Sequence, residues 1–357
     1  LQPRTTINFL VVLVNKVNMK KHFLDFELSE LGVGTYLGEP DDKTSKEYIE
    51  VIKGALAKGV NVVDTAIVYR YMKSERDIGS IIKELGKGSL VISTKGGYVP
   101  YDIDSGADPK DYFYENFVNT GIIKLEEMTP QGHYLSAKFI NWCLEKSLEN
   151  MRTDHVDIYF LHNPEEQLSF FSRESFNRKI RECFEYLESQ VKVGRIRYYG
   201  LATWSGFRVA PTSRQYLNLS ELLKIAVDVA GEDHHFRFIQ LPYNLGMPEA
   251  FTLKNQELNG KKLSSIEACK ELGLYVYTSA SIYQGRVIGR VPQALKEKLK
   301  VSSDVLASLQ FVLSTPGVGT ALVGMSKLRH LEENLEIRNF ERLSPEEFFS
   351  LFKGFSQ

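Results

Sequence analysis

Residues 61–75 read NVVDTAIVYRYMKSE, and this stretch contains the pattern from which the fold can be predicted. An apolar, β-branched run ends at the acidic residue Asp64, and a helix is expected to begin near Ser74. A short apolar run followed by a longer segment of helical periodicity is typical of a βα unit. The number of such units along the chain therefore decides the architecture.

The same pattern recurs between residues 30 and 340. Strands are predicted at LGVG (31–34), VNVVD (60–64), LVISTK (90–95), VDIYFLH (156–162), IRYYGLA (196–202), FRFIQL (236–241), LYVYTS (274–279) and GTALVG (319–324). Eight parallel strands with intervening helices favour an α/β fold of the (β/α)8 TIM barrel type over a doubly wound open sheet. The open sheet is also disfavoured because Gly32, Gly34 and Gly38 miss the G-x-G-x-x-G spacing of a dinucleotide-binding fingerprint.

Two segments flank the predicted barrel, which we assign to residues 19–340. Residues 1–18 are interpreted as an N-terminal extension, and their apolar run FLVVLV is far shorter than the roughly 20 residues that span a membrane. Residues 341–357 are predicted to form a C-terminal helix, capped at Ser344 and packed on the barrel.

A long loop interrupts the even spacing after the third predicted strand. Residues 98–135 are too numerous for an ordinary connection and are rich in tyrosine and phenylalanine. Asp108 and Pro109 are suited to begin a short helix inside this loop. We expect the loop to form an aromatic lid over a substrate, because so apolar a segment is unlikely to lie fully in water.

The composition is that of a soluble globular protein, with 43% apolar and 25% charged residues. A net charge of -1 gives no electrostatic reason to expect nucleic acid or a membrane as partner, so a small-molecule ligand is expected. The widely separated Cys143, Cys183 and Cys269 predict neither a disulfide framework nor a zinc site, which favours a reducing, cytoplasmic location. His234 and His235 would point to opposite faces of a strand, so no metal site is predicted.

Polar residues at the ends of adjacent strands predict an active site. Asp64, Lys95 and His162 end the second, third and fourth predicted strands, and Tyr69 and Tyr71 lie on the loop after the second. Each alone could be a turn cap or a solvated strand end. Together they would converge at the C-terminal face of the barrel, where TIM-barrel enzymes have their active sites.

Such a set suits proton donation to a carbonyl group. An ammonium ion lowers the pKa of a nearby phenol, so Lys95, held by Asp64, is expected to make a tyrosine a better acid. The imidazole of His162 could hydrogen-bond the same carbonyl oxygen and orient it.

Six motifs taken in order resemble the aldo-keto reductase family over roughly residues 20–340: DTAIVY, STKGG, YFLHNPEE, GRIRYYGLATW, IQLPYN and LVGMSKLRHLEENL. The resemblance implies a (β/α)8 barrel that binds NADPH or NADH without a Rossmann motif. It also implies reversible reduction of aldehydes and ketones to alcohols. By the same resemblance Tyr69 is the general acid, Asp64 and Lys95 are its tuning pair, and His162 is the orienting residue.

The resemblance further implies a set of cofactor-binding residues. These are Ala202, Thr203 and Gln240 at the nicotinamide carboxamide, Tyr277 on the nicotinamide ring, Gln284, Gly285 and Arg286 near the pyrophosphate, and Gly324, Ser326, Lys327, His330, Glu333 and Asn334 around the adenosine 2'-phosphate and adenine. For Tyr277 the alternative is an aromatic side chain packed in the barrel core.

Three positions depart from the family pattern. Arg70 stands where a glycine usually follows the tyrosine, which predicts added bulk and charge at the substrate mouth. Ala202 and Thr203 replace the usual serine and asparagine, which removes hydrogen bonds to the carboxamide.

The cluster of Lys327, Arg329 and His330 predicts that NADPH binds more tightly than NADH.

The sequence therefore favours an NAD(P)H-dependent carbonyl reductase. One alternative is a nucleotide-sensing regulatory or scaffold subunit of the same fold with little turnover. Another is a different barrel chemistry, such as an isomerase that uses Lys95 as a Schiff base and needs no nicotinamide.

Overall fold

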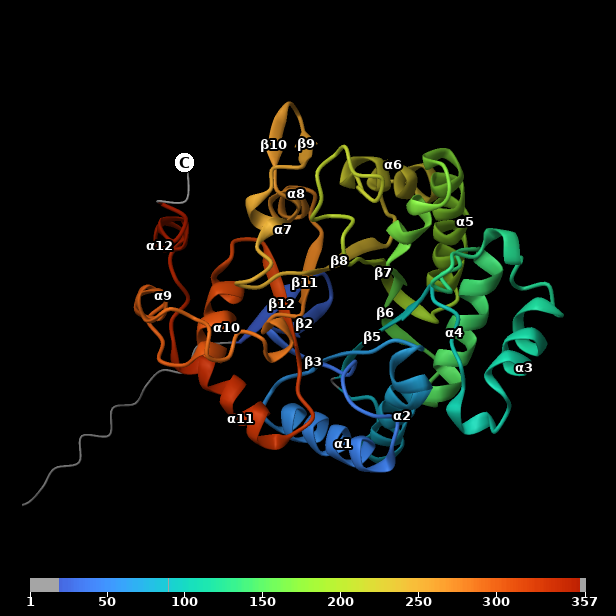
Figure 1. Cartoon of the computed structure of the whole chain (residues 1–357), viewed down its shortest axis with the longest axis horizontal. Coiled ribbons are helices and arrows are strands. Elements are labelled where there is room, and N and C mark those ends of the chain that lie inside the picture. The colour runs from blue at the N-terminus through green and yellow to red at the C-terminus, as the bar shows by residue number, and fades with distance from the viewer. Residues whose placement is uncertain (1–18, 89, 354–357) are drawn as a thin grey trace, which may run out of the picture.

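A closed barrel of eight parallel strands forms the centre of the molecule in the computed structural model, which describes residues 19–88 and 90–353 (Figure 1). The barrel strands are β3 (Leu31–Gly34), β4 (Val62–Asp64), β5 (Val91–Gly96), β6 (Val156–His162), β7 (Ile196–Ala202), β8 (Phe236–Pro242), β11 (Tyr275–Ser279) and β12 (Val318–Gly324). β12 pairs with β3 and so closes the ring. The predicted (β/α)8 barrel is confirmed.

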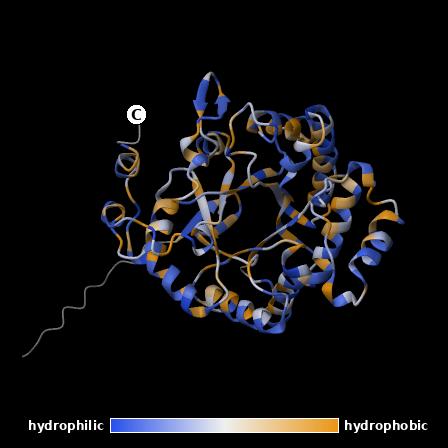
Figure 2. Cartoon of the chain, in the orientation of Figure 1, coloured by the Kyte–Doolittle hydropathy of each residue, from blue (hydrophilic) through white to orange (hydrophobic). Residues whose placement is uncertain are grey.

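Helices surround this ring and cover its outer face (Figure 1). The larger ones are α1 (Asp42–Ala57), α2 (Lys73–Leu85), α4 (Ala137–Met151), α5 (Arg173–Lys192), α6 (Leu219–Ala230), α8 (Ser265–Glu271), α10 (Asp304–Ser314) and α11 (Leu328–Leu335). In α1, Tyr48, Ile52 and Ala55 are buried, and the Asp41 side chain caps the helix by accepting a hydrogen bond from the Thr44 amide. Figure 2 shows hydrophilic and hydrophobic residues side by side along these helices, as expected for helices between a core and water.

The strands bury side chains on both faces. One cluster packs between the barrel and the helices, and a second fills the barrel interior. A hairpin of β1 (Lys20–Phe23) and β2 (Phe26–Ser29) contributes Phe26 and Leu28 to the interior cluster. The Phe23 ring lies 5.4 Å from that of Phe238. The hairpin therefore packs against the interior side chains of the barrel, which leaves the other end for a ligand.

Apart from Tyr98 at its start, the long loop at 98–135 lies beside α4 and not over the barrel mouth. It contains η2 (Ile103–Ser105), α3 (Pro109–Phe113), η3 (Tyr114–Val118) and η4 (Leu125–Glu127), and Asp108 caps α3. The Phe117 ring lies 4.6 Å from Trp142 on α4, and Figure 1 shows α3 outside that helix. The expected lid is therefore wrong, because α4 supplies the apolar surface that buries these aromatic side chains.

The C-terminal part adds smaller elements. These are α7 (Glu249–Thr252), the hairpin of β9 (Gln256–Leu258) and β10 (Lys261–Leu263), η6 (Tyr283–Gly285), α9 (Gln293–Lys298), η7 (Glu336–Asn339) and α12 (Pro345–Ser350). Ser344 caps α12, and the Phe348 ring packs 5.3 Å from Phe251. The predicted extension at 1–18 and residues 354–357 lie outside the described residues.

Two further features of the described residues bear on possible ligands. Within residues 19–88 and 90–353, every helix is too short or too polar to cross a lipid bilayer. The same residues contain no group of three His, Cys, Asp or Glu side chains that could hold a metal ion.

Candidate active site

A buried ion pair lies where β4 and β5 end. These strands are neighbours in the barrel, with Asp64 opposite Ser93. The Lys95 Nζ donates hydrogen bonds to Asp64 Oδ2 at 2.6 Å and to the Thr65 carbonyl oxygen at 2.7 Å. Asp64 Oδ1 accepts from Ser93 Oγ at 2.6 Å and from Gln240 Nε2 at 2.9 Å. Burial lowers the pKa of Lys95, and the charge of Asp64 partly offsets that effect.

Tyr69 lies on a turn with unusual backbone geometry. In η1 (Tyr69–Met72), the three residues after Tyr69 have positive φ angles of 49°, 54° and 74°. Side chains other than glycine rarely adopt this left-handed region, and such strain concentrates at functional sites. The turn brings Tyr69 Oη to 3.3 Å from Lys95 Nζ, and the nitrogen lies 4.8 Å from the centre of the tyrosine ring.

The surroundings of Tyr69 keep its hydroxyl protonated at neutral pH. Burial raises the pKa of Tyr69 well above its usual range, and the charge of Asp64 raises it further. The expected net lowering of this pKa is not found, because burial and the charge of Asp64 outweigh the effect of the nearby Lys95 ammonium. The phenol thus holds a proton that it can donate.

His162 ends β6 and lies against Tyr69. The imidazole ring is edge-on to the rings of Tyr69 at 5.8 Å and Tyr98 at 5.1 Å. Its main-chain oxygen lies 2.8 Å from His133 Nε2, while its own Nδ1 is buried and has no hydrogen-bond partner within the described chain. Burial holds the pKa of His162 well below its usual range, so the ring is neutral and can donate one hydrogen bond to a ligand.

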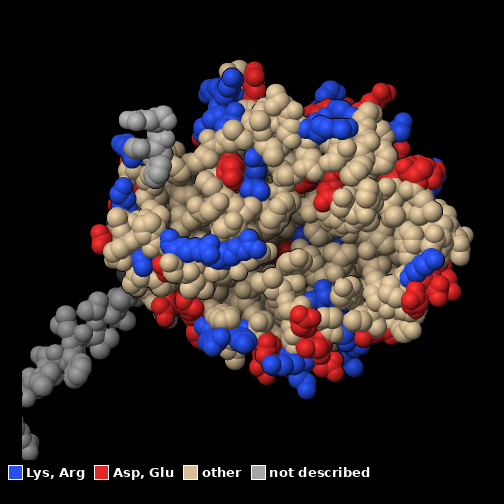
Figure 3. Space-filling model, in the orientation of Figure 1, with Lys and Arg blue, Asp and Glu red and all other residues tan. Residues whose placement is uncertain are grey.

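A cavity of about 770 Å³ opens above these residues. Figure 3 shows it as a hollow at the barrel centre, with walls mostly of uncharged residues and with Lys and Arg side chains on the rim. Thirteen residues named from the sequence line it: Asp64, Tyr69, His162, Ala202, Thr203, Gln240, Gln284, Gly285, Arg286, Gly324, His330, Glu333 and Asn334. The structure therefore brings the catalytic and cofactor candidates to one space, which falls in the range of small-molecule sites.

Four of the named residues do not line this cavity in the described structure: Lys95, Tyr277, Ser326 and Lys327. Lys95 is fully buried behind Asp64 and Tyr69. Tyr277 is also fully buried, and its ring packs 5.8 Å from Phe238 inside the barrel. The arrangement matches the alternative role of Tyr277, that of a core aromatic residue.

Arg70 also lies elsewhere than expected. Its side chain is 1% exposed, and Nη1 contacts Asp77 Oδ2 at 2.5 Å. The expected charge at the substrate mouth is therefore wrong, because the guanidinium group is buried away from the cavity.

Further cavity residues were missed by sequence reasoning. Tyr36 and Leu37 follow β3, Asn163 follows the end of β6, and Trp204 lies two residues beyond β7. Tyr98, which the sequence placed in the aromatic loop over a substrate, also lines the cavity. The signal that could have found them is the same rule that found the others, since residues just beyond barrel strands build the C-terminal face. Ser279, Ala280, Ser281, Ile282 and Tyr283 line the cavity for the same reason.

A barrel with an Asp–Lys pair, a tyrosine and a histidine below one deep cavity defines an enzyme-like site. The family model described as "Aldo/keto reductase family" matches residues 30–228 of this chain. The chain belongs to the aldo/keto reductase family.

Individual relatives cover nearly the whole chain. An uncharacterized oxidoreductase of Bacillus subtilis, YqkF, is 24% identical over 333 residues, with 92% of each chain covered. The holo form of aldo-keto reductase AKR11C1 from Bacillus halodurans has a TM-score of 0.64 at 20% identity, covering 94% of this chain and 95% of that one. An aldo/keto reductase from Klebsiella pneumoniae, solved with NADP and acetate, has a TM-score of 0.56 at 19% identity, covering 92% and 91%. These solved structures share the fold.

Proposed function

We propose that the protein is an NADPH-dependent carbonyl reductase that converts an aldehyde or ketone to an alcohol, with Tyr69 as general acid. The observation that carries the proposal is the position of the Tyr69 hydroxyl. It lies beside the buried Lys95 ammonium and at the wall of a cavity that His162 and Gln240 also line. Family membership and the NADP bound to the Klebsiella relative support the choice of cofactor.

The residues present suit a nicotinamide dinucleotide. Thr203 and Gln240 offer polar groups for a carboxamide, while Arg286 and His330 on the cavity wall could contact phosphate groups. Asn334 is only 2% exposed, and it lines the same cavity as His330. When bound, the reduced nicotinamide supplies the hydride that the carbonyl carbon receives.

The remaining chemistry belongs to side chains of this protein. Tyr69 donates its hydroxyl proton to the carbonyl oxygen, which becomes the alcohol hydroxyl. The phenolate that results lies beside the Lys95 ammonium, whose charge stabilises it. The neutral His162 ring donates a hydrogen bond that holds the carbonyl oxygen in place. Tyr36, Tyr98 and Trp204 on the cavity wall limit the access of water.

Two alternatives fit the site less well. A Schiff base at Lys95 is disfavoured because Nζ is fully buried and hydrogen-bonded to Asp64, Thr65 and Tyr69. A regulatory subunit with little turnover has no need of a protonated tyrosine, a neutral histidine and an ion pair within contact distance of one another.

The test of the function uses the purified full chain. NADPH and NADH are titrated by fluorescence, and a panel of aldehydes and ketones is screened for cofactor oxidation by the loss of the absorbance of the reduced nicotinamide. We expect saturable NADPH binding and turnover of at least one carbonyl compound. Binding without turnover of any compound would favour the regulatory subunit, and absence of binding would reject both functions.

The preference for NADPH is expected to depend on pH through His330. Burial lowers the pKa of His330, and the positive charge of Arg329 lowers it further, so the ring is mostly neutral at pH 7. A 2'-phosphate favours the protonated ring, so NADPH affinity should rise as the pH falls toward the His330 pKa. We expect the ratio of NADH to NADPH dissociation constants to be larger at about pH 6.5 than at about pH 8.

Variants distinguish the effect of His330 protonation on cofactor affinity from the effect of protonation of the 2'-phosphate. In His330→Ala, the ratio should change less with pH, because only the phosphate still titrates. Lys327→Ala should have a smaller effect, since Lys327 is exposed and outside the described cavity wall. An unchanged pH dependence in His330→Ala, or equal affinities for the two cofactors at both pH values, would contradict this role.

A further inference from the structure

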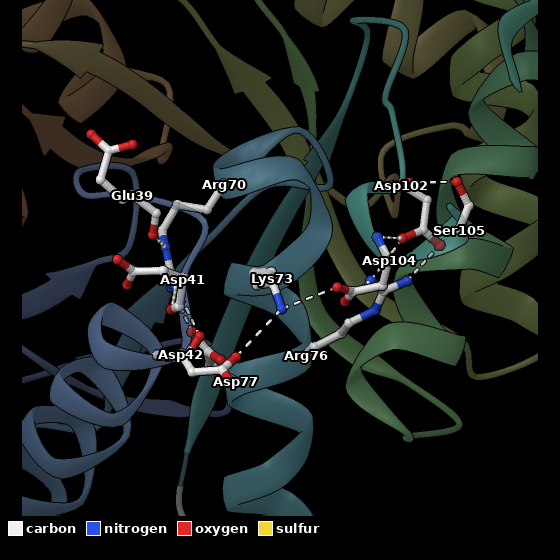
Figure 4. Close-up of polar contacts among 11 residues, drawn as sticks. Glu39, Asp41, Asp42, Arg70, Lys73, Arg76, Asp77, Asp102, Asp104 and Ser105 are labelled. Atoms are coloured by element: carbon white, nitrogen blue, oxygen red, sulfur yellow. Dashed lines mark hydrogen bonds and ion pairs between the residues drawn. The ribbon is translucent and has the colours of Figure 1, made fainter. Parts of the chain in front are cut away.

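Arg70 follows Tyr69 directly, and its guanidinium group makes four polar contacts away from the cavity (Figure 4). Besides the contact with Asp77, Nε donates to the Glu39 carbonyl oxygen at 2.8 Å. Nη2 donates to the Ser45 hydroxyl at 2.9 Å and to the Asp41 carbonyl oxygen at 3.2 Å. All three nitrogens of the planar group are therefore used, which lysine could not reproduce.

Two of these partners, Glu39 and Asp41, lie on the connection between β3 and α1, which borders the cavity. The bonds to residues 39–45 fix the connection between β3 and α1, which carries Tyr36 and Leu37 on the cavity wall. The Tyr36 ring is edge-on to Tyr69 at 5.1 Å. Tyr48 on α1 donates its hydroxyl hydrogen to the Leu37 carbonyl oxygen, and its ring lies 5.4 Å from the Arg70 guanidinium carbon. Arg70 thus joins the turn that carries Tyr69 to the wall that faces it.

The backbone gives a reason for so many bonds. Arg70, Tyr71 and Met72 all have positive φ, a conformation that costs free energy for each residue other than glycine. A turn under this strain persists only where surrounding contacts fix it. The bonds of Arg70 supply such contacts from within the turn itself.

Charged side chains of α2 make a second, more exposed set of contacts nearby. Lys73 bridges Asp42 at 3.7 Å and Asp104 at 3.1 Å, and Arg76 contacts Asp102 at 2.6 Å (Figure 4). The Arg76–Asp102 pair joins α2 to the loop at 98–135 and involves none of residues 69–72. It offers a control for the effect of losing an ion pair in this region.

We propose that Arg70 is a positioning residue for catalysis: its buried guanidinium group fixes the left-handed turn so that the Tyr69 hydroxyl stays beside Lys95 and against Tyr36. The inference rests on the proposed role of Tyr69 as general acid. A purely structural role would require only that the folded state depends on Arg70. The positioning role also requires that the position of the Tyr69 hydroxyl group depends on Arg70.

The decisive variant is Arg70→Gly. Glycine adopts the left-handed conformation without strain, so the turn can still form, but the guanidinium contacts are lost. We expect the turnover number to fall at least about ten-fold, because small displacements of a catalytic group have large effects on rate. The number of NADPH sites per chain, measured by fluorescence titration, should not change. Arg70→Lys should be intermediate, because one ammonium group can reach only some of the partners.

Two further variants isolate the cause. Arg70→Gly leaves Asp77 without its partner, so the double variant Arg70→Gly/Asp77→Asn removes the uncompensated carboxylate. It should regain thermal stability without regaining turnover. Arg76→Ala, which removes an ion pair on the same helix, should turn over like the wild type.

Hydrogen exchange provides a measurement that does not need turnover. In Arg70→Gly, amides of residues 36–45 and 68–72 should exchange faster together, whereas Arg76→Ala should leave both segments unchanged. If wild-type protein reduces no carbonyl, the proposed function fails, and this measurement alone decides whether Arg70 fixes the turn. Unchanged exchange, wild-type turnover in Arg70→Gly, or a loss of turnover that only matches a loss of NADPH sites would each overturn the inference.

Discussion

Replacing Tyr69 with phenylalanine is expected to lower the turnover number for carbonyl reduction by about 10²- to 10⁴-fold, the usual contribution of a general acid. The change removes only the hydroxyl oxygen, so the ring contacts with Tyr36 and His162 should remain. NADPH affinity should therefore change little, as expected when a group acts mainly in the transition state. Steady-state kinetics and fluorescence titration of the same preparation measure both quantities.

Tyr71 provides the matched control. It lies two residues further along the same turn, is 50% exposed, and its ring is edge-on to Tyr101 at 6.1 Å. Tyr71→Phe should change turnover by no more than about two-fold, the size expected for a surface substitution. If Tyr71→Phe abolished turnover while Tyr69→Phe retained it, the assignment of the acid would be wrong. Because burial raises the Tyr69 pKa, wild-type reduction should also show no loss of the acid between about pH 8 and pH 10.

The barrel was predictable because its strands are buried on both faces. Such strands read as continuous apolar runs, and VDIYFLH and IRYYGLA coincide with β6 and β7 at both ends. The meeting of Asp64 and Lys95 was predictable for a related reason. Both end neighbouring parallel strands, and parallel strands present their carboxyl ends at the same edge.

The positions of Arg70 and Tyr277 could not be predicted from local patterns. The side chain of Arg70 leaves the mouth because its backbone has positive φ and because main-chain oxygens of Glu39 and Asp41 accept its hydrogen bonds. Every residue has a main-chain oxygen, so the amino-acid sequence does not indicate which of these oxygens will accept a hydrogen bond from Arg70. For Tyr277, strand alternation indicates an inward direction but not the depth in the barrel, which depends on Phe160 and Phe238.

The aromatic loop illustrates the same limit of local patterns. Its composition indicated correctly that the segment packs against something apolar. The partner surface is formed by Phe139 and Trp142 on α4, which contact Phe117. The composition of the loop indicates that its aromatic side chains are buried. Whether they pack on α4 or at the barrel mouth depends on the path of the whole loop.

Replacing Lys95 with methionine is expected to impair both stability and catalysis. The Lys95 side chain is fully buried and that of Asp64 is 6% exposed, so the variant leaves a carboxylate without its cation inside the protein. Breaking a buried ion pair in this way costs about 3–5 kcal/mol of unfolding free energy. Turnover should also fall by at least about ten-fold, because the Tyr69 phenolate would form without a neighbouring positive charge. Urea unfolding and steady-state kinetics measure the two effects.

Two variants separate these effects. Asp64→Asn/Lys95→Met removes both charges, so it should regain much of the stability while its turnover stays low. Lys87→Met breaks a contact of 2.8 Å with the buried Asp157, which Arg197 also contacts. Since Lys87 and Asp157 lie outside the described cavity wall, this variant should lose stability and keep its turnover per folded molecule. Recovery of turnover in the double variant would mean that Lys95 serves the fold alone and that the Tyr69 phenolate is stabilised by another group.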